Sequence, residues 1–220
     1  MSFMKRTYAV DPTYETQMQE TDLDFRSHLL KIKTLNPDVL AIGGQADAIA
    51  RITQQSYEVG IPARVRRVAA SAASNAPVPE LAGDAVKGLI FAAAFNCNDE
   101  RQNAKDFVKL VQTRYQVRCP DHDFSQAYDT TQLVNQVLRS VKLGLPPATL
   151  KADRVAIRDA LTKVQNFQGL ASGPISFCAE PTAQCRDGNR TGILVEYIKG
   201  GKDYDTRVLA RVSFDADFGL

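Results

Sequence analysis

A strand, a helix and a second strand follow one another within one short stretch, which constrains the fold more than any other part of the sequence. Residues 39–42 form a nearly all-apolar run, as expected of a strand covered on both faces. A Gly-Gly pair at 43–44 permits a tight turn into a helix over residues 49–59, which ends at Gly60. Residues 64–69 then form the second strand. Two strands joined through a helix run parallel with a right-handed crossover, so the sequence predicts an α/β fold.

A further helix is predicted directly before this stretch. Phe25, Leu29 and Ile32 lie on one helical face. Asp24 is suited to cap the first turn, because its carboxylate can accept hydrogen bonds from free amides there. The Asn-Pro pair at 36–37 ends this helix, since the residue before a proline is pushed out of the α conformation.

The densest basic cluster consists of Arg64, Arg66 and Arg67, on the second predicted strand. We expect an edge strand whose arginines are solvated, in preference to a phosphate-binding site. The net charge of +2 gives no reason to expect nucleic acid or an anionic membrane as a partner.

The order of these elements resembles the second lobe of type I periplasmic solute-binding proteins. The closest group is the branched-chain amino acid and amide receptors of ABC importers. The resemblance rests on the Asn-Pro-Asp run at 36–38, the Gly-Gly pair at 43–44, residues 81–88, Phe107, Tyr115, the Ala-Tyr-Asp run at 127–129, the Phe-Gln-Gly run at 167–169 and residues 173–177. It covers most of the chain, and the shared order and spacing make it specific.

The resemblance implies a three-layer αβα fold around a parallel sheet, divided into two lobes. Residues 1–94 and 190–220 would form lobe two, and residues 95–189 would form part of lobe one. The opening sheet of the family has no counterpart in this sequence. We therefore expect an incomplete fold, corresponding to the C-terminal two-thirds of a receptor.

Three amphipathic helices are predicted between residues 99 and 166. The second of them has Phe124, Tyr128 and Leu138 on its apolar face. Each helix must bury such a face, and the resemblance implies that the covering sheet belongs to the part without a counterpart. We therefore expect a homo-oligomer, a swapped dimer or a different packing of these helices.

Four cysteines fall into two pairs that are local in the sequence, Cys97 with Cys119 and Cys178 with Cys185. We expect two disulfides and an oxidising compartment; four unpaired thiols in a cytosolic protein are the alternative. The first residues do not form a secretory signal, and no apolar run reaches the length of about 18 residues that a membrane span needs. We expect a periplasmic location for a longer parent protein.

No catalytic constellation is visible, so we expect a binding protein without a cofactor rather than an enzyme. The run Cys119-Pro-Asp-His122-Asp123 carries side chains that could ligate a metal, but it lacks the paired spacing of a zinc site. A bridged cysteine beside a solvated acidic turn is the favoured interpretation, and no metal is expected. The Gly-Gly pair at 43–44 lacks the rest of a dinucleotide fingerprint or a P-loop.

Ligands of open α/β sheets bind beyond the carboxyl ends of the strands, and the resemblance points to the same two loops. Gln45 is the predicted contact in the first loop, where the adjacent helix N-terminus favours an oxygen atom of the ligand. Ser71 and Ser74 are the predicted contacts in the second loop. The alternatives are that Gln45 caps its own helix and that the serines satisfy their own loop. Tyr128 is a further predicted contact, with packing at the hinge as the alternative.

The resemblance implies the substrate-binding component of an ABC importer, which closes two lobes on a small polar metabolite and delivers it to a permease. A ligand-sensing regulatory or receptor domain on the same fold is the alternative. Leucine-type receptors tend to place an acid in the second loop to hold the ammonium group of the ligand. Residues 69–78 contain none, and an unpaired ammonium in a closed cleft is costly. A branched-chain amino acid is therefore a weaker candidate than an amide or an aromatic acid, and without lobe one we expect weak binding or none.

Overall fold

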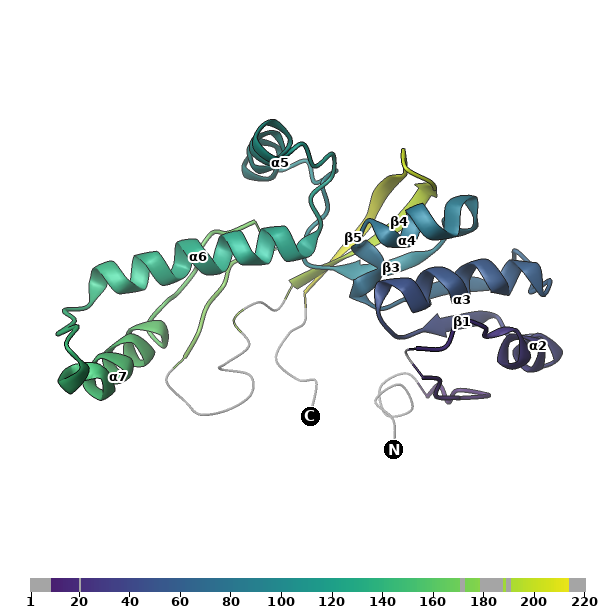
Figure 1. Cartoon of the computed structure of the whole chain (residues 1–220), viewed down its shortest axis with the longest axis horizontal. Coiled ribbons are helices and arrows are strands. Elements are labelled where there is room, and N and C mark those ends of the chain that lie inside the picture. The colour runs from purple at the N-terminus through teal and green to yellow at the C-terminus, as the bar shows by residue number, and fades with distance from the viewer. Residues whose placement is uncertain (1–8, 20, 171–172, 179–187, 189–190, 214–220) are drawn as a thin grey trace. The chain divides into compact units, whose positions relative to one another are not determined.

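A computed structural model of the chain describes residues 9–19, 21–170, 173–178, 188 and 191–213 (Figure 1). The chain divides into two compact units. The first unit consists of Met1–Phe91 and Glu196–Arg207, and the second consists of Ala92–Val195 and Val208–Leu220. The assignment of these units to lobe two and lobe one stays a prediction.

One sheet has the strand order β1 (Val39–Ile42), β2 (Arg66–Ala69), β3 (Ile90–Ala93), β4 (Thr191–Lys199) and β5 (Asp205–Ser213). β1 pairs with β2 in parallel and β2 pairs with β3 in parallel. The connection between β4 and β5 is too short for the crossover that parallel strands need, so these two neighbours form an antiparallel hairpin. The predicted α/β class and the parallel strand–helix–strand unit are confirmed.

The helical elements of the first unit are α2 (Arg26–Thr34), α3 (Ala46–Glu58), η1 (Ser71–Ser74), α4 (Pro77–Ala82) and η2 (Gly83–Val86). Phe25 and Leu29 are buried together with Ile49 and Ile52 of α3. The side chain of Gln55 joins α3 to the start of α2, because its Oε1 accepts from the Phe25 amide at 2.7 Å and its Nε2 donates to the Leu23 carbonyl at 2.9 Å.

The capping role predicted for Asp24 is present one residue earlier than the usual cap position. Phe25 is the N-cap residue of α2 and forms no side-chain cap. The Asp24 carboxylate instead accepts a hydrogen bond from the Arg26 amide at 3.0 Å. This backbone hydrogen bond, with the nearby Arg26 guanidinium, lowers the pKa of Asp24 below its ordinary value.

Arg67 departs from the expectation that all three clustered arginines are solvated. β2 lies between β1 and β3 rather than at an edge of the sheet, and Arg67 is buried. Its guanidinium donates to the Ser56 hydroxyl at 2.7 Å and to the carbonyls of Val65 and Ile61 at 3.0 Å each, and it lies 3.7 Å from the centre of the Tyr57 ring. Arg67 thus fastens the loop between α3 and β2, and burial lowers the pKa of its guanidinium.

The second unit contains α5 (Gln102–Tyr115), α6 (His122–Ser140), η3 (Pro147–Thr149) and α7 (Leu150–Leu161). One apolar cluster joins α5 to the chain after β3 and consists of Phe95, Ala104, Phe107, Val111 and Leu170. A second cluster joins α6 and α7 and has Leu133, Val137 and Val164 at its centre.

The apolar face predicted for α6 is not the face that the structure buries. Phe124, Tyr128 and Leu138 are about two-fifths exposed, whereas the buried stripe of α6 includes Ser125, Asp129, Leu133 and Val137. Asp129 can lie inside because both of its carboxylate oxygens are 2.8 Å from the Leu170 amide. The neighbouring Gly169 leaves room for that carboxylate, which a side chain at this position would overlap.

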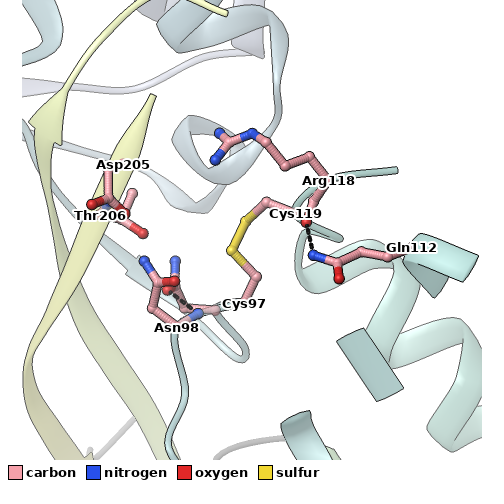
Figure 2. Close-up of a disulfide and its surroundings, with 8 residues drawn as sticks. Cys97, Asn98, Gln112, Arg118, Cys119, Asp205 and Thr206 are labelled. Atoms are coloured by element: carbon pink, nitrogen blue, oxygen red, sulfur yellow. Dashed lines mark hydrogen bonds between the residues drawn. A yellow bond between two sulfur atoms is a disulfide. The ribbon is translucent and has the colours of Figure 1, made fainter. Parts of the chain in front are cut away.

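Cys97 and Cys119 form a disulfide with a Cα–Cα distance of 5.3 Å, as predicted (Figure 2). The bond encloses α5, and next to it the Gln112 side chain donates to the Arg118 carbonyl at 2.6 Å. Cys185 lies outside the described residues, so its pairing with Cys178 stays a prediction.

A buried carboxylate holds several parts of the second unit together. Asp99 has no exposed side-chain surface and is paired with Arg101 at 2.9 Å and with Arg211 at 2.8 Å. Burial alone would raise the pKa of Asp99, but the hydrogen bonds from Arg101 and Arg211 outweigh it and hold this pKa below its usual value. Arg101 also donates to the Leu170 carbonyl, so it links Asp99 to the loop that Asp129 holds.

Candidate ligand-binding site

Two loops leave the same edge of the sheet in the first unit. Ile42, the last residue of β1, is in register with Ala69, the last residue of β2. The Ala70 amide donates to the Ile42 carbonyl at 3.1 Å, so the two loops are adjacent where they begin. The loop after β1 leads to α3 and the loop after β2 leads to η1. Side chains on both loops are therefore carried by one rigid parallel pair of strands.

Gln45 occupies the N-cap position of α3, and its own side chain does not cap the helix. Gly44 makes the turn into this position with a φ of +130°, a conformation that residues with a side chain rarely adopt. The Gln45 side chain is exposed, and within the described part of the chain it forms no hydrogen bond. Its amide group, together with the free N–H groups in the first turn of α3, can thus receive a ligand oxygen.

Ser71 and Ser74 differ from each other although both belong to η1. Ser71 is exposed, and its hydroxyl has no hydrogen-bond partner among the residues described here. Ser74 is partly buried and its hydroxyl is 3.2 Å from the side-chain oxygen of Asn75, so it takes part in bonding within its own loop. Of the two serines, Ser71 is the one whose hydroxyl is available to a ligand.

Tyr197 holds the second loop in place, a role that sequence reasoning missed. Its hydroxyl donates to the Ala73 carbonyl at 2.7 Å in the buried interior, and its ring lies 5.1 Å from that of Phe91. The sequence signal was weak, because a tyrosine in an apolar strand reads simply as a core residue. Tyr197 is a positioning residue, since it acts on η1 and not on a ligand.

Tyr128 belongs to the second unit, on α6. Its ring lies 5.2 Å from the ring of Phe107 on α5, which is buried. Tyr128 therefore has a packing role within its own unit, and its contact with a ligand stays a prediction.

A family model described as periplasmic binding protein matches residues 10–202. The chain belongs to the periplasmic binding protein family. The resemblance inferred from the sequence is confirmed. A comparison with curated proteins finds no match.

Solved structures of this family share the fold. A leucine binding protein from Thermotoga maritima is 22% identical with a TM-score of 0.70, and the alignment covers 89% of this chain and 50% of that chain. A solute binding protein of an ABC transporter from R. palustris, in complex with benzoate, is 18% identical with a TM-score of 0.73 and coverages of 95% and 53%. An amino acid ABC transporter substrate-binding protein from Pseudomonas fluorescens is 17% identical with a TM-score of 0.73 and coverages of 97% and 54%. The chain thus spans about half the length of these relatives.

A hollow of about 580 Å³ lies on the second unit, at η3 and α7. Leu150, Lys151, Arg154, Val155 and Arg158 are among the residues that line it. None of the predicted ligand contacts lines this hollow.

Two further questions raised by the sequence are whether the Cys119–Asp123 run could hold a metal and whether any helix could span a membrane. Among the described residues, no three His, Cys, Asp or Glu side chains converge to hold a metal ion. Cys119 of the Cys-Pro-Asp-His run is bonded to Cys97, and His122 lies 3.3 Å from the Asp123 carboxylate. The helices in the described ranges are all too short or too polar to cross a membrane.

Proposed function

We propose that this chain binds a small polar metabolite at the carboxyl edge of β1 and β2, as part of the substrate-binding component of an ABC importer. In that role it would work outside the cytoplasm and present the metabolite to a membrane permease. Membership of the periplasmic binding protein family supports the role, and the Cys97–Cys119 disulfide supports an oxidising compartment. The function is binding, with no covalent chemistry.

The observation that supports this proposal most directly is that the side chains of Gln45 and Ser71 are both exposed. Both side chains stand on adjacent loops at one sheet edge, and neither makes a hydrogen bond within the described part of the chain. An amide group and a hydroxyl can together donate to and accept from a polar ligand. We assign Ser74 a smaller part, because its hydroxyl is already engaged with Asn75.

The ligand class follows from the charge of the two loops. The second loop, residues 69–78, contains no acidic side chain, so it offers no partner for an ammonium group. The first-turn N–H groups of α3 can donate to a ligand oxygen, and the Asp47 carboxylate in the same turn favours a carbonyl oxygen over a fully charged carboxylate. We therefore favour an aromatic acid or a small amide over a free branched-chain amino acid. Two structural neighbours from Rhodopseudomonas are in complex with benzoate and with 3,4-dihydroxy benzoic acid, and one from Streptococcus pneumoniae is in complex with isoleucine.

Calorimetric titration of the 220-residue chain with benzoate, a small amide and isoleucine tests the proposal. Gln45→Ala and Ser71→Ala should each weaken the best ligand about 3- to 10-fold, the loss expected for one hydrogen bond. Gln54→Ala is the matched control, because Gln54 is an exposed glutamine on the same helix, distant from its N-terminus. Equal losses in Gln45→Ala and Gln54→Ala, or tightest binding of isoleucine, would contradict the assigned edge or the assigned ligand class respectively.

A further inference from the structure

Positive charge is concentrated in the second unit, around η3 and α7. Residues 139–163 contain six lysines or arginines and only two aspartates, whereas the rest of the chain carries a net negative charge. Both aspartates are already engaged. Asp153 accepts from two backbone amides of the preceding loop at 2.9 and 3.0 Å, and Asp159 is paired with Arg158 at 2.7 Å. The net charge of +2 for the whole chain therefore does not reflect this local excess of cations.

Three of these cations form one row on the surface of α7. Lys151, Arg154 and Arg158 are spaced three and four residues apart, which places them within about a sixth of the helical circumference. All three are exposed, and all three line the hollow of about 580 Å³ at η3 and α7. The side chains of Lys151 and Arg154 have no ion-pair or hydrogen-bond partner within the described part of the chain. We call these three residues the α7 basic row.

The α7 basic row does not belong to the face by which α7 packs onto α6. Ile157, Ala160 and Leu161 make that packing, and at 3.6 residues per turn their face is centred about 100° around the helix from the row. A layer placed over the row would bury cations that have no acidic partner among the described residues, which is costly. The row is therefore a surface that meets either solvent or an anionic partner.

Exposed aliphatic side chains flank the α7 basic row. Leu150 and Val155 lie on either side of it around the helix, are 50% and 40% exposed, and also line the hollow. Leu145, in the loop before η3, is 80% exposed, the largest fraction for a large apolar side chain in the described part of the chain. Cations alone would fit any acidic partner. A bilayer interface accepts both kinds of side chain, because cations contact the lipid phosphates while aliphatic groups enter the acyl boundary.

We propose that the α7 basic row, together with Leu145 and Leu150, is a docking surface for the headgroups of an anionic lipid bilayer. The lipid phosphates would lie against the three cations, and the two leucines would enter the boundary between headgroups and acyl chains. Each Lys or Arg near such a surface contributes about fivefold in affinity, so three give a preference of about 100-fold over a neutral bilayer. The docking is independent of the proposed ligand contacts, because none of them lines the hollow.

Sedimentation with phosphatidylcholine vesicles that contain about 30% phosphatidylglycerol, or none, tests the surface. The wild-type chain should bind the anionic vesicles at least about tenfold more strongly, and about 0.5 M NaCl should weaken this binding, because salt screens exposed charges. Lys151→Gln/Arg154→Gln should lower the partition coefficient about 10- to 30-fold. The matched control is Lys105→Gln/Lys109→Gln on α5, which removes the same charge from exposed positions of the same unit and should change binding less than about threefold.

An apolar variant distinguishes a bilayer from an acidic protein. Leu145→Asn removes the exposed aliphatic group and suits the left-handed backbone at this position, where φ is +67°. It should lower vesicle binding about 3- to 10-fold, because the leucine no longer enters the acyl boundary. Binding to soluble poly-glutamate, which has no apolar interior, should be the same in Leu145→Asn and in the wild type.

Four results would overturn the proposal. A wild-type chain that does not sediment with anionic vesicles at about 5 mM lipid, or that binds neutral vesicles equally well, removes the anionic bilayer as partner. Equal losses in the two double variants remove the α7 basic row as the surface. Vesicle binding that is unchanged in Leu145→Asn contradicts the bilayer and, with poly-glutamate bound as tightly, assigns the surface to an acidic protein. Circular dichroism melts establish that the variants fold, which is expected because every replaced side chain is exposed.

Discussion

Two helices of similar length, α3 in the first unit and α7 in the second, differ sharply in how much they bury. α3 has 13 residues, of which Ala48, Ile49, Ala50, Ile52, Thr53, Gln55 and Ser56 are buried. α7 has 12 residues, and none of them is fully buried. The elements that contact α3 include α2, α4 and η1, whereas α7 packs mainly against α6 and η3. Both helices are amphipathic, so the difference shows that burial depends on the surrounding layers and not on the helix pattern alone.

The largest expected effect is on the free energy of unfolding when a leucine in each unit is replaced by alanine. Leu29→Ala on α2 should lower the free energy of unfolding of the first unit by about 2–5 kcal/mol, since Leu29 is fully buried. Leu150→Ala on α7 should cost less than about 1 kcal/mol, because half of Leu150 is exposed. Hydrogen exchange resolved by peptide measures the two units separately. Equal losses at both sites would remove the contrast between the units.

The second unit, whose helix α7 has no buried residue, also contains the Cys97–Cys119 disulfide. Cys97→Ser/Cys119→Ser should lower the free energy of unfolding of the second unit by about 3 kcal/mol, because the open chain regains loop entropy in the unfolded state. Peptides of α5 should lose exchange protection while those of α3 keep it. Loss of protection in α3 to the same degree would show that the two units unfold together.

The Asp99 ion pairs should contribute a smaller and pH-dependent share. Asp99→Asn should cost the second unit about 2 kcal/mol at pH 7, because Arg101 and Arg211 lose a buried charged partner. The folded state lowers the pKa of Asp99, so this stabilisation is complete above the unfolded-state value of about 3.9 and is lost as the pH falls through the lower folded value. Urea titrations of wild type and variant at pH 7, 5 and 3 measure it. A difference that is unchanged at pH 3 would mean that the carboxylate is not its source.

The smallest effect on stability is expected at the proposed ligand contacts. Gln45→Ala and Ser71→Ala should change the free energy of unfolding by less than about 0.5 kcal/mol, since both side chains are exposed and unbonded in the described part of the chain. Tyr197→Phe is the contrasting variant, because it deletes the buried hydrogen bond to the Ala73 carbonyl and should cost about 1–2 kcal/mol. Thermal melts rank the three variants. A large loss in Gln45→Ala would indicate a structural role.

Sequence patterns predicted the β1–α3–β2 segment well because its apolar residues are both periodic and buried. The strand over residues 39–42 has the predicted bounds. The next strand begins at Arg66 rather than at residue 64, because a turn closes between the Val65 amide and the Pro62 carbonyl at 3.0 Å. Local propensity does not fix such a turn.

The features of the fold that the sequence did not reveal share one physical cause. In each, a charged side chain is buried because specific partners satisfy its hydrogen bonds. Hydrophobic periodicity gave no sign that Asp129 is buried on α6, where the Leu170 amide satisfies its carboxylate. Arg67 was expected in solvent and is buried against carbonyls of its own loop. These partners are distant in the chain or belong to the backbone, so no spacing rule reveals them.

The proposed binding edge is tested most directly by amide chemical shifts during a titration of the ¹⁵N-labelled chain with benzoate. We predict that the largest changes occur at residues 43–48 and 70–74, saturate at up to about 10 mM ligand and weaken in Gln45→Ala but not in Gln54→Ala. Shifts that saturate but are confined to other parts of the chain, with benzoate, a small amide or isoleucine, would contradict the account.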